Sequence, residues 1–124
     1  RPSDRALDPD EACELAASDA FSIGAHSLSH ASLPALTDDA KRREVGDSRA
    51  ACEQQIGQAV TSFAYPFGDR DRATERVVAE CGFLYACATD PGVAVSIRDR
   101  FHLPRVAVED WSAEELARRL DGVE

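Results

Sequence analysis

Two of the three histidines, His26 and His30, lie four residues apart, directly after the short apolar segment 21–25. If this region forms a helical turn, side chains four residues apart lie on one face. Two imidazoles placed in this way can bind one divalent metal ion, and zinc is the usual metal for nitrogen ligands. A zinc protease helix would need Glu after the first histidine, and Ser27 stands there. The spacing indicates either ordinary surface or capping histidines, or two metal ligands that need a third, a carboxylate elsewhere.

A second candidate for chemistry is the segment 63–68, Phe-Ala-Tyr-Pro-Phe-Gly, which ends another apolar run. Pro66 and Gly68 force a sharp turn there. Such a turn can direct a backbone N–H into a pocket, where it stabilises an oxyanion. The alternative is an ordinary turn with packed aromatic side chains, and the segment taken by itself favours that alternative.

The composition narrows the classes of partner. The chain has 124 residues, and its 23 acidic side chains exceed its 14 Lys and Arg, which gives a formal net charge of −9. This charge would repel a phosphate backbone, so we expect no nucleic-acid partner. No apolar run approaches the roughly 20 residues that a membrane span needs. The chain begins at Arg1 and contains no Met, so we expect a piece of a longer protein.

The four cysteines are Cys13, Cys52, Cys81 and Cys87, and none of them forms a CxxC pair. Zinc knuckles and thiol redox motifs need a tighter spacing than this. Small buried thiols are therefore the favoured interpretation. A disulfide bond is the alternative, and it leaves the redox compartment open.

Amphipathic segments alternate with short apolar segments, and this order determines the expected fold. Strands that alternate with helices imply an α/β fold with a mostly parallel sheet. About four strands cannot close a β/α barrel, which needs about 200 residues or more. We therefore expect a small open sheet or part of a barrel, with one edge that is exposed or paired with something outside this sequence. The expected helices begin at Asp8-Pro9, run from Thr37 towards Ile56, cover residues 72–80, and begin again at Ser112 with a capping box to Glu115; the expected strands cover residues 21–25, 60–65, 83–88 and 103–108.

The two motifs together resemble those of the polysaccharide deacetylases, a carbohydrate esterase family built on the NodB homology domain. His26-Ser27-Leu28-Ser29-His30 matches the family motif H-[ST]-x-x-H, and residues 63–68 resemble the F-A-Y-P-x-G form of its turn motif. The resemblance covers about residues 7–120. It implies a partial, distorted β/α barrel in which residues 1–124 are the C-terminal part of one domain and the first strand or strands lie outside this chain.

The resemblance also implies an activity, which is the metal-dependent hydrolysis of N-acetyl groups on N-acetylated sugars or polysaccharides. His26 and His30 would hold the divalent metal, most simply zinc, together with an aspartate. Ser27 would support the histidine loop from outside the metal's ligand shell. The backbone N–H of Phe67 would face the oxyanion, with Tyr65 beside it at the substrate. Many family members act outside the cytoplasm, whereas this sequence leaves the compartment open.

The sequence departs from the family pattern at three places. The two adjacent aspartates that serve as catalytic base and third metal ligand would precede His26, and nothing there matches them. Ala64 replaces the arginine of the more common turn motif. The family's acid histidine lies in a late Leu-x-His motif, whereas His102 precedes Leu103. His102 is nevertheless the candidate general acid, and Arg105 is a candidate for organising the pocket.

The leading hypothesis is therefore a hydrolase of carbon–nitrogen, non-peptide bonds that acts on N-acetylated carbohydrate. Two alternatives stay open, an inactive carbohydrate-binding or structural module, and a related metal-dependent hydrolase of a non-sugar amide. Because two ligands cannot close a metal site, we expect the isolated chain to bind metal weakly and to lack useful activity without the missing N-terminal part of the domain. Tight zinc binding by the isolated chain in calorimetry would contradict this expectation.

Overall fold

A parallel sheet brings together segments that lie far apart in the sequence. The structure, a computed structural model, describes residues 5–92, 96 and 100–122. Strand β1 (Ser62–Ala64) pairs in parallel with β2 (Tyr85–Cys87), and a single parallel bridge adds a segment on each side of this pair. Four segments therefore lie side by side in chain order, which confirms the predicted parallel α/β arrangement. The aligned pairs are Ala25 with Phe63, Phe63 with Ala86, and Cys87 with Leu103.

The two outer segments are shorter than predicted. Instead of strands over 21–25 and 103–108, the structure has one bridge at Ala25 and one at Leu103, and Phe21 is 59% exposed. An outer segment has fewer neighbours to hold it, so its pairing ends early. Leu103 is followed by Pro104, whose missing N–H removes a donor from the ladder. The two inner strands lie within the predicted ranges 60–65 and 83–88 and are also shorter.

The predicted helices form at their predicted places. Thr37 caps α2 by accepting a hydrogen bond from the Ala40 N–H, and Gly57 ends the helix in the left-handed conformation with φ of 68°. The capping box predicted at Ser112 is half formed, because the Glu115 carboxylate instead contacts Arg118 and Arg119. No helix in the described ranges is both long and apolar enough to cross a membrane. The bounds are α1 Pro9–Ala16, α2 Asp38–Ile56, α3 Arg72–Glu80 and α4 Ala113–Asp121, with short 3-10 turns at η2 Leu33–Ala35 and η3 Pro66–Gly68.

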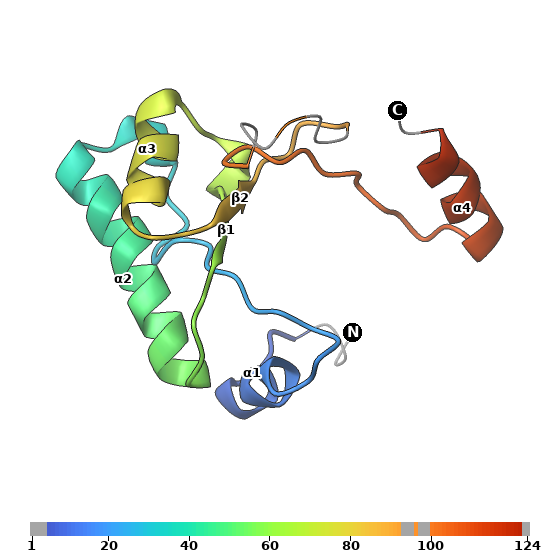
Figure 1. Cartoon of the computed structure of the whole chain (residues 1–124), viewed down its shortest axis with the longest axis horizontal. Helices are drawn as coiled ribbons and strands as arrows, with labels where there is room; N and C mark the ends of the chain where they lie inside the picture. The colour runs from blue at the N-terminus through green and yellow to red at the C-terminus, as the bar shows by residue number, and fades with distance from the viewer. Residues whose placement is uncertain (1–4, 93–95, 97–99, 123–124) are drawn as a thin grey trace.

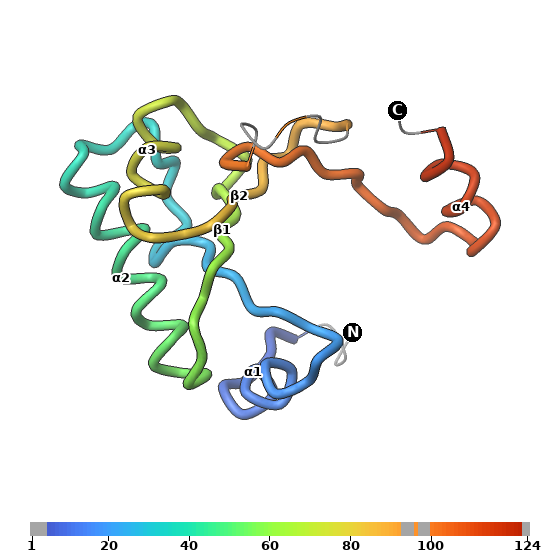
Figure 2. The backbone as a smooth tube through the Cα atoms, in the orientation of Figure 1, coloured from blue at the N-terminus to red at the C-terminus, as the bar shows by residue number. Residues whose placement is uncertain are grey.

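The core lies where α2 and α3 pack beside each other on one side of the strands (Figure 1). Helix α1 reaches the C-terminal end of α2, where the Cys13 thiol donates to the Gln55 carbonyl. Helix α4 follows a long extended connection (Figure 2), and none of its described side chains is buried. The sheet, α2 and α3 are therefore the rigid part that positions a site. The fully buried core side chains are Leu33, Val45, Val60, Phe63, Tyr65, Val77 and Val78.

All four cysteines, Cys13, Cys52, Cys81 and Cys87, are free thiols. This confirms the favoured interpretation, although the side chains are half-buried rather than fully buried. Burial raises the pKa of the Cys52 and Cys81 thiols, which keeps both in the protonated, unreactive form. The cysteines therefore contribute packing rather than crosslinks to this part of the protein.

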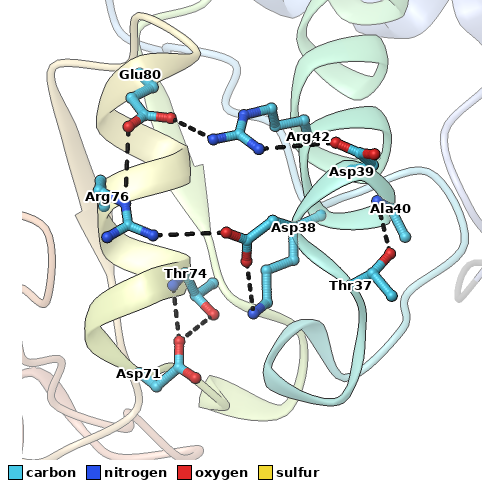
Figure 3. A network of polar contacts seen from close by, with 10 residues as sticks. Thr37, Asp38, Asp39, Ala40, Arg42, Asp71, Thr74, Arg76 and Glu80 are labelled. Atoms are coloured by element: carbon cyan, nitrogen blue, oxygen red, sulfur yellow. Dashed lines mark hydrogen bonds and ion pairs between the residues drawn. The ribbon is translucent and has the colours of Figure 1, made fainter.

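Charged side chains join the exposed faces of α2 and α3 (Figure 3). Asp38 of α2 pairs with Arg76 of α3 at 3.6 Å, and Arg42 of α2 pairs with Glu80 of α3 at 3.0 Å. Exposed pairs of this kind contribute little each, about 0–1 kcal/mol. The network therefore sets how the two helices lie against each other more than it determines the total stability.

Asp71 caps α3 and provides a test of the charge contribution. Its carboxylate accepts hydrogen bonds from the Thr74 hydroxyl at 2.6 Å and the Thr74 N–H at 2.7 Å. These bonds hold the pKa of Asp71 below its usual value, which is about 3.9. A carboxylate whose pKa is lowered on folding stabilises the fold above its unfolded pKa. That stabilisation is lost as the pH falls through the folded-state value.

We therefore expect Asp71→Asn to lower the free energy of unfolding at pH 7 by about 0.5 kcal/mol, since Asn keeps a capping oxygen but loses the charge. The difference between the two proteins should shrink as the pH falls towards about 2, where the aspartate is protonated. Urea unfolding at both pH values measures it. A difference of equal size at both would contradict the assignment.

Candidate active site

The predicted site residues follow the ends of the parallel segments. His26 comes directly after Ala25, the turn 65–68 comes directly after β1, and Arg105 comes two residues after Leu103. Because the segments are parallel, their carboxyl ends meet at one edge of the sheet. Ligands of parallel α/β folds bind at this edge. The topology therefore brings the predicted residues to the same side of the molecule.

The two histidine rings lie together, although not by means of a helical turn. Their centroids are 4.8 Å apart, with the planes at 73°. The segment is a bend in which Ser27 and His30 both take left-handed backbone conformations, with φ of 67° and 58°. A bend, and not one face of a helical turn, therefore brings the two rings together.

A hydrogen bond sets the tautomer of His26. Its Nδ1 lies 2.8 Å from the Ala64 carbonyl oxygen. A carbonyl oxygen can only accept, so Nδ1 carries the proton and Nε2 keeps a free lone pair. Metal-binding histidines are held in this way, with one ring nitrogen donating to a carbonyl or carboxylate and the other facing the metal. Ala64 belongs to β1, so the sheet itself orients the ring.

Hydrogen bonds also hold the loop between the histidines. The Ser27 hydroxyl accepts from the His30 N–H at 3.0 Å, which fits the supporting role predicted for Ser27. Glu44 of α2 accepts hydrogen bonds from Leu28 and Ser29. These hydrogen bonds hold the pKa of Glu44 below its usual value, and the two from Ser29 have the largest effect. Glu44 could not be predicted from the sequence, because nothing in a helical pattern indicates that one glutamate reaches a loop 15 residues earlier.

The turn after β1 lies against the second histidine. Phe67 has φ of 59° and is 65% exposed, and its ring centroid is 4.6 Å from that of His30 at 80°. The Ser32 hydroxyl donates to the Asp69 carboxylate at 2.8 Å, so the histidine loop and the turn are also linked behind these rings. Asp69 was not predicted either. The ring of Phe67 therefore packs against the second member of the histidine pair.

Backbone strain is concentrated in the histidine loop and in the turn after β1. The non-glycine residues with positive φ in the described chain are Ser27, His30 and Phe67. Such a conformation costs roughly 1–3 kcal/mol for each residue and persists only where the surroundings hold it. For a bulky aromatic residue such as Phe67 it is a genuine outlier. All three belong to the two predicted motifs, which is the pattern expected of a functional site rather than of chance turns.

Tyr65 supports the turn from inside the fold. Its side chain is 1% exposed, and its hydroxyl donates to the Phe101 carbonyl at 2.6 Å. Burial raises the pKa of Tyr65, so the phenol stays neutral. The side chain therefore lies in the core rather than at a surface that a substrate could reach. In the described structure Tyr65 ties the turn after β1 to the chain before Leu103, and its contact with substrate stays a prediction.

The remaining two candidates, His102 and Arg105, flank the outer bridge at Leu103. His102 is partly exposed, and its Nδ1 lies 3.6 Å from a carboxylate oxygen of Glu75. The Arg105 Nε donates to the Ala88 carbonyl at 2.6 Å. Arg105 also lines a hollow of about 280 Å³ together with Thr89, Val106 and Ala107. Arg105 thus borders a recess, while its role in organising the pocket and the acid role of His102 both stay predictions.

The donor chemistry fits two ligands of a metal site. His26 has one ring nitrogen free by its hydrogen bond to Ala64, and the His30 ring lies beside it. Within residues 5–92, 96 and 100–122, no group of three or more His, Cys, Asp or Glu side chains could hold a metal ion. The origin of a third ligand outside this chain stays a prediction.

Comparisons of the sequence and of the structure with known proteins point to the same family. The sequence model of the polysaccharide deacetylases matches residues 3–86. The chain is 28% identical over 88 residues to YxkH of Bacillus subtilis (strain 168), which carries the name of a polysaccharide deacetylase. It is similar in structure to the Streptococcus pyogenes deacetylase PplD, with a TM-score of 0.85 and 24% identity over 98% of this chain. It is also similar to BC0361, a polysaccharide deacetylase from Bacillus cereus, with a TM-score of 0.80 and 26% identity over 93% of this chain.

The relatives are longer than this chain. The matched region covers 71% of this chain but 32% of YxkH. The structural matches cover 53% of the PplD chain and 37% of the BC0361 chain. The chain thus spans between a third and about half of the proteins that it resembles.

Proposed function

The chain belongs to the polysaccharide deacetylase family, and from this premise we propose that the full-length protein hydrolyses N-acetyl groups of N-acetylated sugars or polysaccharides. The observation that carries the proposal is the histidine pair, in which the Ala64 carbonyl leaves Nε2 of His26 free beside the His30 ring. The strained turn at Phe67 lies directly against this pair. PplD, the solved relative with acetate bound, supports the proposal, because acetate is the product of such a reaction.

We further propose that residues 1–124 are the C-terminal part of one NodB-like domain, a partial, distorted β/α barrel. The four parallel segments in chain order support this assignment. At one edge, Ala25 pairs with Phe63. A preceding strand would pair there and would bring its own side chains next to His26. The third ligand and the base would come from that part of the domain.

A divalent metal, most simply zinc, would be held by His26 and His30 together with a carboxylate from outside this chain. When bound, the metal supplies a Lewis acid that polarises an amide carbonyl. The role of this chain is to hold both rings and to keep one proton on Nδ1 of His26, where Ala64 accepts it. A ligand with a fixed tautomer loses less freedom on binding, which raises affinity.

The other residues take roles around the acetyl group. We propose that the Phe67 N–H donates to the oxyanion that forms as water adds to the acetyl carbon. When the carbon–nitrogen bond breaks, the leaving amine takes up a proton, which we propose that His102 donates. The products are acetate and the free amine of the sugar. Ser27 and Tyr65 hold the loop and the turn, and Arg105 borders the recess next to them.

Metal removal tests the proposal on the full-length protein with an N-acetylated oligosaccharide as substrate. We expect chelation to lower the rate of acetate release by at least about 100-fold, because the Lewis acid is lost, and added zinc to restore it. Activity that survives thorough metal removal would contradict the proposal. A metal-loaded protein that binds the oligosaccharide but releases no acetate would favour a carbohydrate-binding module, an alternative that Ala64 in place of the family arginine supports.

A further inference from the structure

Glu44 of α2 accepts three hydrogen bonds from the loop between the two histidines. Oε2 of Glu44 accepts from the Leu28 N–H at 3.0 Å and from the Ser29 N–H at 2.9 Å. Its Oε1 accepts from the Ser29 hydroxyl at 2.7 Å. Both carboxylate oxygens are therefore bound to the two residues that separate Ser27 from His30.

The support behind these bonds is rigid. Glu44 precedes Val45, which is fully buried in the core, and α2 is capped at both ends by Thr37 and Gly57. Hydrogen bonds to an ionised acceptor are shorter and roughly twice as strong as neutral ones. The Glu44 carboxylate thus fixes the loop to a helix that cannot easily move away from the sheet.

The loop needs such an anchor because its conformation is unfavourable by itself. Ser27 and His30 both have left-handed backbones, and Leu28, between them, is exposed. Strained residues persist only where the surrounding structure over-determines them. Without the anchor, the loop would relax, and the His30 ring would leave its place 4.8 Å from the His26 ring.

We propose that Glu44 is a positioning residue of the metal centre, which acts by holding the loop that places His26 and His30. This inference rests on the proposed function, since it concerns the same two histidines. Glu44 is not proposed as a ligand, since the described residues form no group of three that could hold a metal ion. It acts on the metal through the two backbone N–H groups and the hydroxyl that it binds.

The test measures zinc affinity of the full-length protein by competition with a chelator, which needs no activity. Outer partners of metal ligands typically change metal affinity by 10- to 100-fold, and we expect Glu44→Gln to weaken zinc binding within that range. The variant should also speed hydrogen exchange at the Leu28 and Ser29 amides. If the variant folds poorly, Ser29→Ala removes only the bond to Oε1 and should weaken binding by a smaller factor.

Glu53→Gln is the matched control. Glu53 lies on the same helix and also accepts a backbone N–H, that of Val60 at 3.0 Å, together with Arg49 at 3.0 Å. Removing the charge of Glu53 should destabilise the protein while leaving zinc affinity unchanged. Equal effects of Glu44→Gln and Glu53→Gln on affinity would mean that both act through stability, which would overturn the inference.

A His26→Ala variant separates this inference from the proposed function. If His26→Ala abolishes zinc binding while Glu44→Gln and Ser29→Ala both leave it unchanged, the metal centre stands and the role of Glu44 is wrong. If His26→Ala also leaves zinc binding unchanged, the metal centre itself is wrong.

Discussion

Replacing His26 with alanine is expected to lower zinc affinity of the full-length protein by more than about 100-fold, because loss of a direct ligand exceeds the 10- to 100-fold effect of losing an outer partner. Deacetylase activity should fall with it. The physical reason is specific to this ring, whose tautomer the Ala64 carbonyl fixes with Nε2 free. Zinc competition titration and acetate release measure the two effects on the same preparation.

His102→Ala is the matched control for this change, because it removes the third histidine of the chain by the same substitution. It should leave zinc affinity intact and lower only the rate, as expected of a general acid. Equal loss of zinc binding in both variants would show that histidine removal acts through folding. Unchanged binding in His26→Ala would remove the basis of the proposed metal centre.

Replacing Gly68 with alanine is expected to disrupt the turn that holds Phe67 and to lower the free energy of unfolding by roughly 2–5 kcal/mol, combining left-handed strain with overpacking. Gly68 has φ of 73°, and an added Cβ would lie 2.9 Å from the Thr89 Cβ, with Thr89 Oγ1 closer still. Neither Gly68 nor Thr89 can move freely, since both follow paired strands. The displaced turn should also lower kcat if the Phe67 N–H has the oxyanion role that we propose for it.

Gly57→Ala separates the two causes. Gly57 has a similar φ of 68°, but nothing lies within 4 Å of the added Cβ. It should therefore show only the strain, about 1–2 kcal/mol. Adding Thr89→Ala to Gly68→Ala should recover part of the difference. Urea unfolding measures all three variants, and a Gly68→Ala effect no larger than that of Gly57→Ala would contradict the close contact.

The helices could be predicted from the sequence because their ends are set locally. Thr37 and Gly57 delimit α2 through hydrogen bonds and backbone conformations within a few residues. Strand limits could not be predicted in the same way, because pairing depends on neighbours that lie far along the chain. The outer segments at Ala25 and Leu103 have few such neighbours, so each keeps only a single bridge.

The candidate site likewise has features that are set locally and features that depend on residues far along the chain. The His26 and His30 spacing indicated a pair, but the left-handed bend that joins the rings depends on anchors outside the motif. Glu44 is such an anchor, and its helix shows only an amphipathic pattern in the sequence, which does not indicate a contact with the loop. The hydroxyl of Tyr65 likewise finds its hydrogen-bond partner in the Phe101 carbonyl, 36 residues later. Contacts between residues so far apart in the sequence depend on how the whole chain packs. Local sequence patterns therefore do not predict them.

Anomalous diffraction at the zinc edge, from crystals of the full-length active protein, tests the metal centre most directly. We expect one zinc peak about 2.0–2.1 Å from Nε2 of His26 and from one ring nitrogen of His30, with Nδ1 of His26 still bonded to the Ala64 carbonyl. A zinc ion bound elsewhere, or bound to His26 through Nδ1, would contradict it.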